Sequence, residues 1–475
     1  MICLVLSVLI LGSCKKEEIQ RPNILWINSD DLGPELACYG NPDVTTPHID
    51  QLAAEGVRFT KAYSNSPVCS SSRSSLITGM YPPSVNSHDH RTINMTDLPE
   101  GIKPITEYFR KAGYFVSLGD AKDMSKMGKA DYNFLNKKMY DGPDWSGRAK
   151  GQPFFAQVHI KYPHRTFEEH VKNPVDPNNV ALPACYPDHP LLRADWALYL
   201  ESVQHCDDYV GKILKRLEDE SLADNTIVFF FGDHGRPHLR DKQFLYEGGI
   251  KIPLIVRWPQ KLKPKVDGQL VSLVDVAATS LNLAGIKLPE HLQGQVFLGE
   301  KANEREYVYA FRDRAGNAVD NIRSITDGRH KLIWNRMAST PYMQLSSYKK
   351  AQYPAFTLYK VLHARGQLQK PFNLFMAEKR PEIELYDLGK DPMEAHNLAD
   401  NPAYSDIKKE LFDNLKDRMP AFEKNMVPET SETTAKAKQG SYNYYVSLME
   451  KRGLDPDISD EDYLKYWEKR LLNQN

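Results

Sequence analysis

Continuous apolar runs of strand length recur along the first two thirds of the chain. They lack the alternation of half-exposed strands, which indicates strands buried on both faces of a largely parallel sheet. Stretches with the apolar spacing of helices lie between them. We expect strands at 23–28, 113–118, 153–160, 225–231, 252–258 and 306–311, and helices at 47–57, 104–113, 195–220 and 272–285. This alternation predicts an α/β fold.

The pattern becomes shorter and more polar after about residue 320. Two short apolar runs flank the turn-forming sequence Asp-Gly-Arg at 327–329 and predict an antiparallel pair of strands. A helix is expected at 405–419 and an amphipathic one at 460–472. We therefore expect a large α/β domain over 21–320. A smaller C-terminal α+β subdomain with a short antiparallel sheet and a terminal helical extension follows over 321–475.

The N-terminal segment 1–14 has an apolar run from Ile2 to Leu11, then Gly-Ser-Cys, then charged residues. The run is too short to span a bilayer and has the length of the apolar region of a secretory signal. Leu-Gly-Ser-Cys resembles the lipobox of bacterial lipoproteins, which implies lipidation of Cys14. We predict an exported protein at the periplasm or cell surface, held to the membrane by a lipid anchor. A simple cleaved signal peptide is the alternative.

The charge of the chain argues against nucleic acid as a partner. The 475 residues contain 61 Lys and Arg and 62 Asp and Glu, so the formal net charge is -1. No basic field surrounds the protein, and any anion-binding site must be local. Outside the leader, the four cysteines Cys38, Cys69, Cys185 and Cys206 are widely scattered. Their spacing is not that of a disulfide framework or a zinc site, although a pair among them stays open.

Chemically active residues follow three of the predicted strands. Asp30 and Asp31 follow the first, His164 follows the strand at 153–160, and Asp233 and His234 follow the strand at 225–231. Ligands bind outside the carboxyl ends of strands in open α/β sheets, so these side chains should meet at one edge. Adjacent carboxylates repel unless a cation neutralises them, and a hard divalent ion suits them. Turns and helix caps are the alternative reading of such pairs.

The stretch "NSPVCSSSRSSLITGMYP" (65–82) contains a cysteine and an arginine one helical turn apart. Its small residues predict a loop that enters a helix, whose N-terminus attracts anions. Arg73 would add a fixed positive charge. Cys69 could be a nucleophilic thiolate. It could equally be a small buried apolar residue beside a capped helix.

The same stretch resembles the Cys-x-Pro/Ala-x-Arg signature of type I sulfatases, in which a maturing enzyme oxidises the cysteine to formylglycine. Five further segments resemble the family in order: "TPHIDQLAAEGVRFTKAYS", "YPHR", "FFFGDHG", "KQFLYEGGIKIPLIVRWP" and "ELYDLGKDPMEAHNLAD". The chain looks most like heparan N-sulfatase (N-sulfoglucosamine sulfohydrolase) and its bacterial relatives. The resemblance implies an alkaline-phosphatase-like fold and a sulfatase activity.

The resemblance also assigns roles to single residues. It implies catalytic roles for Cys69, Arg73, Lys129, His164 and Lys242, with Cys69 modified to formylglycine (3-oxoalanine). It implies a Ca²⁺ site, or alternatively a Mg²⁺ site, formed by Asp30, Asp31, Cys69, Asp233 and His234. The sequence departs from the family pattern at three positions. Ser71 replaces the usual Pro or Ala, Asp131 replaces a histidine, and His234 replaces an Asn.

Candidate substrate-binding residues follow the cysteine-bearing helix in "NSHDHR" (86–91). His88, His90 and Arg91 suit sugar hydroxyls, carboxylates or sulfates, and Asp131 is expected to meet the sugar. A polar loop without such a role is the alternative. The resemblance implies a sulfated oligosaccharide as substrate, derived from a glycosaminoglycan, with an N-sulfoglucosamine or O-sulfated sugar.

Two other functions stay open from the sequence. A phosphate or phosphonate ester hydrolase of the same superfamily can share an Asp-His metal pair, which His234 permits. A surface glycan-binding lipoprotein without catalytic activity would keep Cys69 unmodified.

Overall fold

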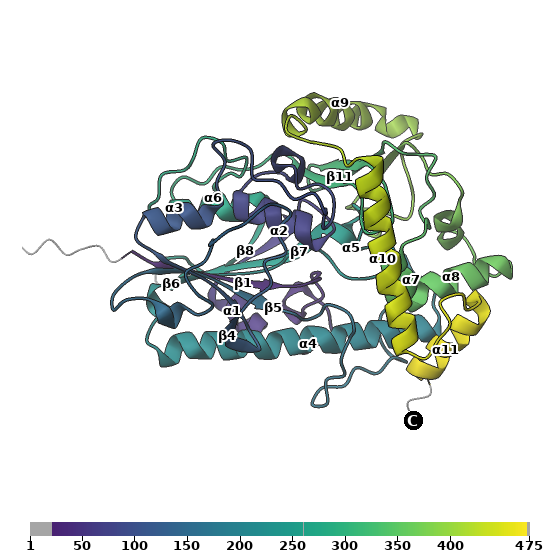
Figure 1. Cartoon of the computed structure of the whole chain (residues 1–475), viewed down its shortest axis with the longest axis horizontal. Coiled ribbons are helices and arrows are strands. Elements are labelled where there is room, and N and C mark those ends of the chain that lie inside the picture. The colour runs from purple at the N-terminus through teal and green to yellow at the C-terminus, as the bar shows by residue number, and fades with distance from the viewer. Residues whose placement is uncertain (1–20, 260, 473–475) are drawn as a thin grey trace, which may run out of the picture.

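An eight-stranded sheet forms the centre of the larger part of the protein (Figure 1). The computed structural model describes residues 21–259 and 261–472, so the predicted signal segment and Cys14 lie outside the described residues. The strand order is β4-β3-β5-β1-β6-β7-β2-β8. The strands are β1 (Asn23–Ser29), β2 (Val57–Tyr63), β3 (Phe115–Asp120), β4 (Asp123–Met127), β5 (Phe154–Ile160), β6 (Thr226–Gly232), β7 (Lys251–Arg257) and β8 (Lys265–Ser272).

The sheet is largely parallel, as predicted. Strands β3, β5, β1 and β6 run parallel to one another, and β2 runs parallel to β8. Strand β7 is antiparallel to both of its neighbours, and β4 is antiparallel to β3. The carboxyl ends of β5, β1 and β6 therefore lie next to one another, which gathers the residues that follow them at one edge.

Different helices cover the two faces of this sheet. Within β1, Ile24 and Trp26 pack with α2, α3 and α6, whereas Leu25 and Ile27 pack with α1 and α4. Figure 1 shows the long helix α4 below the sheet and α2, α3 and α6 above it. The helices of this part are α1 (Pro47–Glu55), α2 (Cys69–Thr78), α3 (Ile105–Lys111), α4 (Pro190–Asp219), α5 (Glu247–Ile250) and α6 (Val274–Leu283). The α/β prediction is confirmed.

A second sheet of four antiparallel strands follows in the chain, in the order β12-β11-β10-β9. Its strands are β9 (Val308–Arg312), β10 (Ile322–Thr326), β11 (His330–Asn335) and β12 (Ile383–Asp387). The predicted strand pair around 327–329 is confirmed as β10 and β11. The strand expected at 306–311 belongs to this sheet and not to the large one, because an apolar run does not reveal its partner. Our division of the chain at residue 320 stays a prediction.

Five α-helices complete the described C-terminal part. They are α7 (Ser347–Gln352), α8 (Pro354–Ala364), α9 (Ser405–Phe422), α10 (Ser431–Lys451) and α11 (Asp460–Leu472). Helices α9 and α11 confirm the predicted helices, whereas α10 was not predicted. Helix α9 packs on the small sheet through Leu411 and Leu415.

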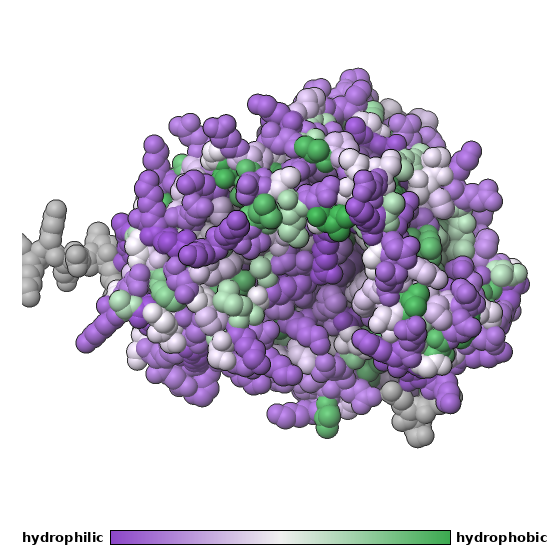
Figure 2. Space-filling model, in the orientation of Figure 1, coloured by the Kyte–Doolittle hydropathy of each residue, from purple (hydrophilic) through white to green (hydrophobic). Residues whose placement is uncertain are grey.

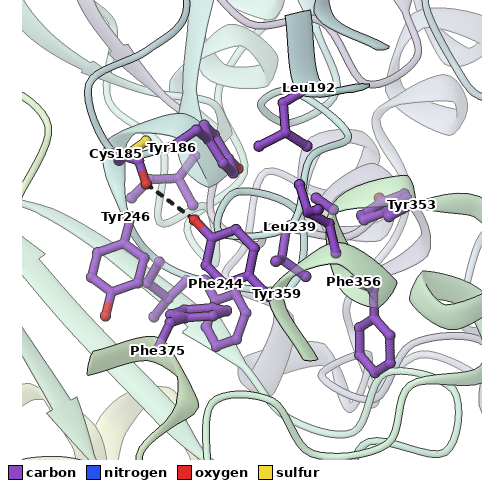
Figure 3. Packing of buried hydrophobic residues seen from close by; sticks show 14 of the residues in the cluster. Cys185, Tyr186, Leu192, Leu239, Phe244, Tyr246, Tyr353, Phe356, Tyr359 and Phe375 are labelled. Atoms are coloured by element: carbon purple, nitrogen blue, oxygen red, sulfur yellow. Dashed lines mark hydrogen bonds between the residues drawn. The ribbon is translucent and has the colours of Figure 1, made fainter. Parts of the chain in front are cut away.

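An aromatic core joins the C-terminal helices to the larger part of the protein. Figure 3 shows Tyr186, Phe244, Tyr359 and Phe375 packed together. The same cluster continues to Met449 of α10 and to Tyr463 and Trp467 of α11, among others. The position of α10 is thus fixed by buried contacts. Within the described part of the chain, no helix combines the length and apolarity that crossing a bilayer requires.

Candidate active site

Backbone hydrogen bonds hold the three strand ends together at the predicted edge. The Asp30 amide donates to the carbonyl of Ile160 at 3.0 Å, and the Asp233 amide donates to the carbonyl of Ser29 at 2.9 Å. The Asp31 amide donates to the Asp233 carboxylate at 2.9 Å. Asp31 lies in the left-handed region with φ 59°, which is uncommon for a residue other than glycine. The sequence rule for strand ends therefore placed these carboxylates correctly.

Cys69 is the first residue of α2 and is only 1% exposed. Its Sγ lies 3.3 Å from His234 Nε2 and 3.7 Å from both Asp31 Oδ1 and Lys242 Nζ. No side chain caps the start of α2. The sulfur thus faces charged and polar groups at a helix N-terminus, which disagrees with the reading of Cys69 as an apolar space filler. The described cysteines Cys38, Cys69, Cys185 and Cys206 are all free.

Three cationic side chains surround the carboxylates. Arg73 donates to Asp233 Oδ2 at 3.1 Å and also donates to Asp30. Lys129 Nζ lies 2.9 Å from Asp30 Oδ2. Lys242 Nζ donates to both carboxylate oxygens of Asp31, at 2.7 and 2.8 Å. Arg73 and Lys242 are buried, so these charges act with little screening by water.

The charges keep the buried carboxylates ionised. Burial raises the pKa of Asp30, but Lys129, Arg73 and His159 outweigh this effect and hold that pKa well below its usual value. The pKa of Asp31 is likewise held well below its usual value, because Lys242, His164 and His234 outweigh burial. The site therefore combines fixed negative and positive charges in a buried setting.

Two histidines present the same ring nitrogen to the site. His164 Nδ1 donates to the backbone carbonyl of Arg165 at 2.6 Å, and His234 Nδ1 donates to that of Gly235 at 2.9 Å. These bonds turn Nε2 of each ring toward the site, where it can accept a proton or bind a cation. His164 Nε2 lies 3.9 Å from Asp31 Oδ2. Burial lowers the pKa of His164, and the negative charge of Asp31 opposes this effect only in part.

The predicted substrate residues occupy different places. His90 accepts or donates a 2.8 Å bond with Ser70 Oγ, and Arg91 forms a two-bond ion pair with Asp131 at 2.9 and 2.8 Å. Both Arg91 and Asp131 have φ 51°. Strained backbone of this kind gathers at functional sites. Neither His88, whose Nε2 lies 3.5 Å from Asp89, nor Asp131 lines the cavity described below.

Ser71, which replaces the usual Pro or Ala, has a structural partner. Its hydroxyl donates to the backbone carbonyl of His88 at 3.1 Å. Neither Pro nor Ala has a side chain that can donate this bond. Ser71 therefore ties the 86–91 loop to α2.

A cavity of about 630 Å³ opens above these groups. This volume is within the roughly 300–1,000 Å³ of small-ligand pockets. Figure 2 shows the surface hollowed beside α10, with mainly hydrophilic residues in the hollow. The lining includes Asp30, Cys69, His90, Arg91, Lys129, His159, Lys161, His164, Lys242, Gln243, Arg314, Tyr348, Lys436, Gly440 and Tyr444. Lys and Arg dominate its charged residues, which suits an anionic ligand.

Several of these residues were missed from the sequence. His159, inside β5, has Nε2 3.1 Å from Asp30 Oδ2. It sits at the end of an apolar run, where the strand-end rule could have found it. Tyr348 and the residues of α10 are far from the other site residues in sequence, and nothing local marks them.

The fold is that of the alkaline-phosphatase-like hydrolases. A phosphonate monoester hydrolase from Silicibacter pomeroyi has a similar fold, with a TM-score of 0.62 and 18% identity, over 87% of this chain and 98% of that one. The sulfatase family model matches residues 22–286, and the model of the C-terminal region of N-sulphoglucosamine sulphohydrolase matches residues 232–343. The chain belongs to the sulfatase family.

Curated relatives agree with this assignment. An ulvan-active sulfatase of Formosa agariphila is 33% identical over 482 residues, which cover 86% of this chain and 79% of that protein. Human N-sulphoglucosamine sulphohydrolase is 26% identical over 468 residues, which cover 86% of this chain and 91% of that protein. The predicted family and hydrolase class are thereby confirmed.

Proposed function

We propose that this sulfatase hydrolyses a sulfate monoester or sulfamate with a nucleophile derived from Cys69. The observation that carries the proposal is the position of Cys69 Sγ at the start of α2, within 3.7 Å of Asp31, His234 and Lys242 and at the base of the cavity. Conversion of the cysteine to formylglycine would place a hydrated aldehyde there. Its hydroxyl is the attacking oxygen in this proposal.

The surrounding side chains supply the rest of the chemistry. Arg73, Lys129 and Lys242 stabilise the negative charge of the sulfuryl oxygens. His164 presents Nε2 to the site, because its Nδ1 is bonded to the Arg165 carbonyl. This nitrogen would donate a proton to the leaving group or accept one from the formylglycine hydrate. His159 is a further positioning residue, because its 3.1 Å bond fixes the Asp30 carboxylate.

The buried carboxylates and His234 fit a divalent cation. Candidate ligand atoms of Asp31, Cys69 and His234 lie within 4.8 Å of one another, as do those of Asp30, Cys69 and Asp233. Carboxylate oxygens dominate this set, which suits a hard ion, and we propose Ca²⁺ with Mg²⁺ as the alternative. When bound, such an ion supplies positive charge beside the reacting group.

Metal removal gives the first prediction. We expect Ca²⁺ added to chelator-treated protein to raise Tm, because an ion that binds only the folded state stabilises it by about 2.7 kcal/mol at a hundred times its Kd. Asp233→Asn should lose this rise. Asp207→Asn should keep it, because Asp207 binds the backbone amide of Ile49 at 2.7 Å, away from the site. A Tm that does not respond to Ca²⁺ or Mg²⁺ would contradict the metal proposal.

The substrate is proposed to be a sulfated sugar. The relatives named above act on ulvan or on N-sulphoglucosamine by their names, and the basic cavity suits an anionic saccharide. We also propose that the protein is exported and anchored to the membrane through Cys14. A maturing enzyme is proposed to act on Cys69.

The second prediction tests this function against its main competitor. His234 beside Asp233 also suits a phosphate or phosphonate ester hydrolase. We expect the enzyme, made with a maturing enzyme, to release sulfate from at least one of a panel of heparan, chondroitin and algal oligosaccharides. An aryl sulfate serves as a simple reference substrate. Release of phosphate or phosphonate from ester substrates without any sulfate release would reverse the assignment.

A further inference from the structure

One wall of the cavity is formed by α10, which lies beyond both segments matched by the family models. Lys436, Ala437, Gly440, Ser441 and Tyr444 line the cavity. Their spacing places them along one face of the helix. Figure 1 shows α10 running from near α9 to α11. The proposed catalytic groups and this helix face therefore line the same cavity.

The start of α10 is tied to the loop that carries Arg91. Asn94 Nδ2 donates to Thr433 Oγ1 at 2.7 Å, and Thr92 Oγ1 donates to Glu429 at 2.9 Å. The other end is held in the aromatic core by Met449. The helix is thus a fixed wall and its cavity face has a defined position.

Gly440 has no packing reason to be glycine. A Cβ added there would meet no atom within 4 Å. By contrast, a Cβ on Gly211 of α4 would lie 2.5 Å from the His48 ring, so that glycine is needed for close contact. A glycine inside a helix destabilises it relative to alanine. The unfilled space beside Gly440 lies in the cavity, where a ligand can occupy it.

Lys436 places an exposed positive charge on the same face. Its side chain is 63% exposed, and its ion pair is with Glu432 one turn earlier, at 2.6 Å. Such an exposed pair is weak and easily exchanged for a ligand. Arg314, also on the cavity, is already bonded to Glu429 through two nitrogens.

Tyr444 adds an aromatic surface. Its ring stacks near Tyr348, with centroids 6.5 Å apart and planes 27° apart, and Tyr348 neighbours His164 at 6.4 Å. The Tyr444 hydroxyl accepts a 2.8 Å bond from Gln352. An amphipathic ring held in this way suits the apolar face of a sugar.

We propose that α10 selects the substrate: the sugar occupies the space beside Gly440, and Lys436 binds a second anionic group of that sugar, a carboxylate or another sulfate. This inference rests on the proposed function, because it assigns a substrate class to the same cavity. It predicts that the preferred substrate carries at least two negative groups.

The variant Lys436→Gln tests whether the positive charge of Lys436 binds the second anionic group of the sugar. Lys438→Gln is the matched control. Lys438 is exposed on the same helix and does not line the cavity. The substrate is the panel member with the highest sulfate release, compared with the same sugar lacking its second anionic group. We expect Lys436→Gln to raise KM about tenfold for the doubly charged sugar, the size of one charge-assisted hydrogen bond. The increase for the singly charged sugar should be at least five times smaller, and Lys438→Gln should leave both KM values unchanged.

Other outcomes decide against the inference. Equal effects of Lys436→Gln on both sugars, equal effects of the two lysine variants, or a best substrate with a single anionic group would each overturn it. Each of those results would still be compatible with the proposed sulfatase activity. Absence of sulfate release from every panel member and from the aryl sulfate would instead defeat the proposed function and this inference with it.

The variant Gly440→Phe tests whether the sugar occupies the space beside Gly440. We expect kcat/KM for the oligosaccharide to fall at least about tenfold, because the new ring fills the cavity, while Gly440→Ala keeps or raises Tm. Gln439→Phe is the control, since Gln439 is exposed and absent from the lining. Unchanged turnover in a folded Gly440→Phe protein would overturn the role of this space. If that variant fails to fold, Lys436→Gln still decides.

Discussion

Cys69→Ala is expected to lower kcat/KM by about 10⁶-fold, the scale seen when a catalytic nucleophile is removed. The helix start, the cations and the carboxylates would remain, but no attacking atom would be left among them. Because the thiol is small and belongs to none of the four apolar core clusters among the described residues, Tm should change little. Sulfate release from the aryl sulfate and from the best oligosaccharide measures the effect.

Cys185→Ala is the control for Cys69→Ala. Cys185 is another buried free cysteine, but it lies in the aromatic core. Its replacement should cost some stability by removing a buried side chain but leave turnover within about twofold, because Cys185 does not line the cavity that holds the site. The mass of the peptide that contains Cys69 should also show the thiol replaced by an aldehyde in active protein. Full activity of Cys69→Ala, or an unmodified thiol in fully active protein, would contradict the proposed mechanism.

Arg165→Ala is expected to destabilise the fold by about 3–5 kcal/mol, the cost of leaving a buried partner charge uncompensated. Arg165 donates to both oxygens of Asp195, at 2.7 and 2.6 Å, and both side chains are about 95% buried. Its guanidinium also lies over the rings of Phe167 and Tyr353, at 4.2 and 4.4 Å. Because it follows His164 directly, its loss should reduce activity as well. Urea unfolding measures the free energy.

Arg193→Ala is the matched comparison for Arg165→Ala. Arg193 also binds an aspartate through two nitrogens, but its partner Asp188 is 71% exposed. Exposed pairs contribute about 0–1 kcal/mol, so the loss should be small. The double variant that combines Arg165→Met with Asp195→Leu should recover much of the stability, because it leaves no unpaired buried charge. Equal losses for the two arginine variants would show that burial does not govern the Arg165 pair.

The site residues that the strand pattern alone predicted are those that follow buried strands. Asp30, His164 and Asp233 obey a local rule, because strand ends of a parallel sheet meet at one edge. The carboxylates and the cysteine were placed from short segments, and the structure brings these segments together. The α/β class also followed from the length and apolarity of the strands.

What could not be predicted depends on long-range packing. The apolar run of β7 does not reveal that it runs antiparallel to its neighbours, and the run that forms β9 does not reveal which sheet it joins. The α10 wall depends on contacts such as that of Asn94 with Thr433, which are 339 positions apart. No periodicity within α10 marks the cavity face, since small and polar residues on a helix usually indicate exposure to water.

The burial of Cys69 has a consequence for when it can be modified. All ten residues of α2 are buried, and the sulfur lies beneath a cavity that is closed on one side by a helix made hundreds of residues later. A maturing enzyme could not bind this segment in the folded protein. The proposed oxidation of Cys69 should therefore take place on the newly made chain, before residues 65–82 are packed into the fold. A chain that folds first would keep its thiol until this segment unfolds again.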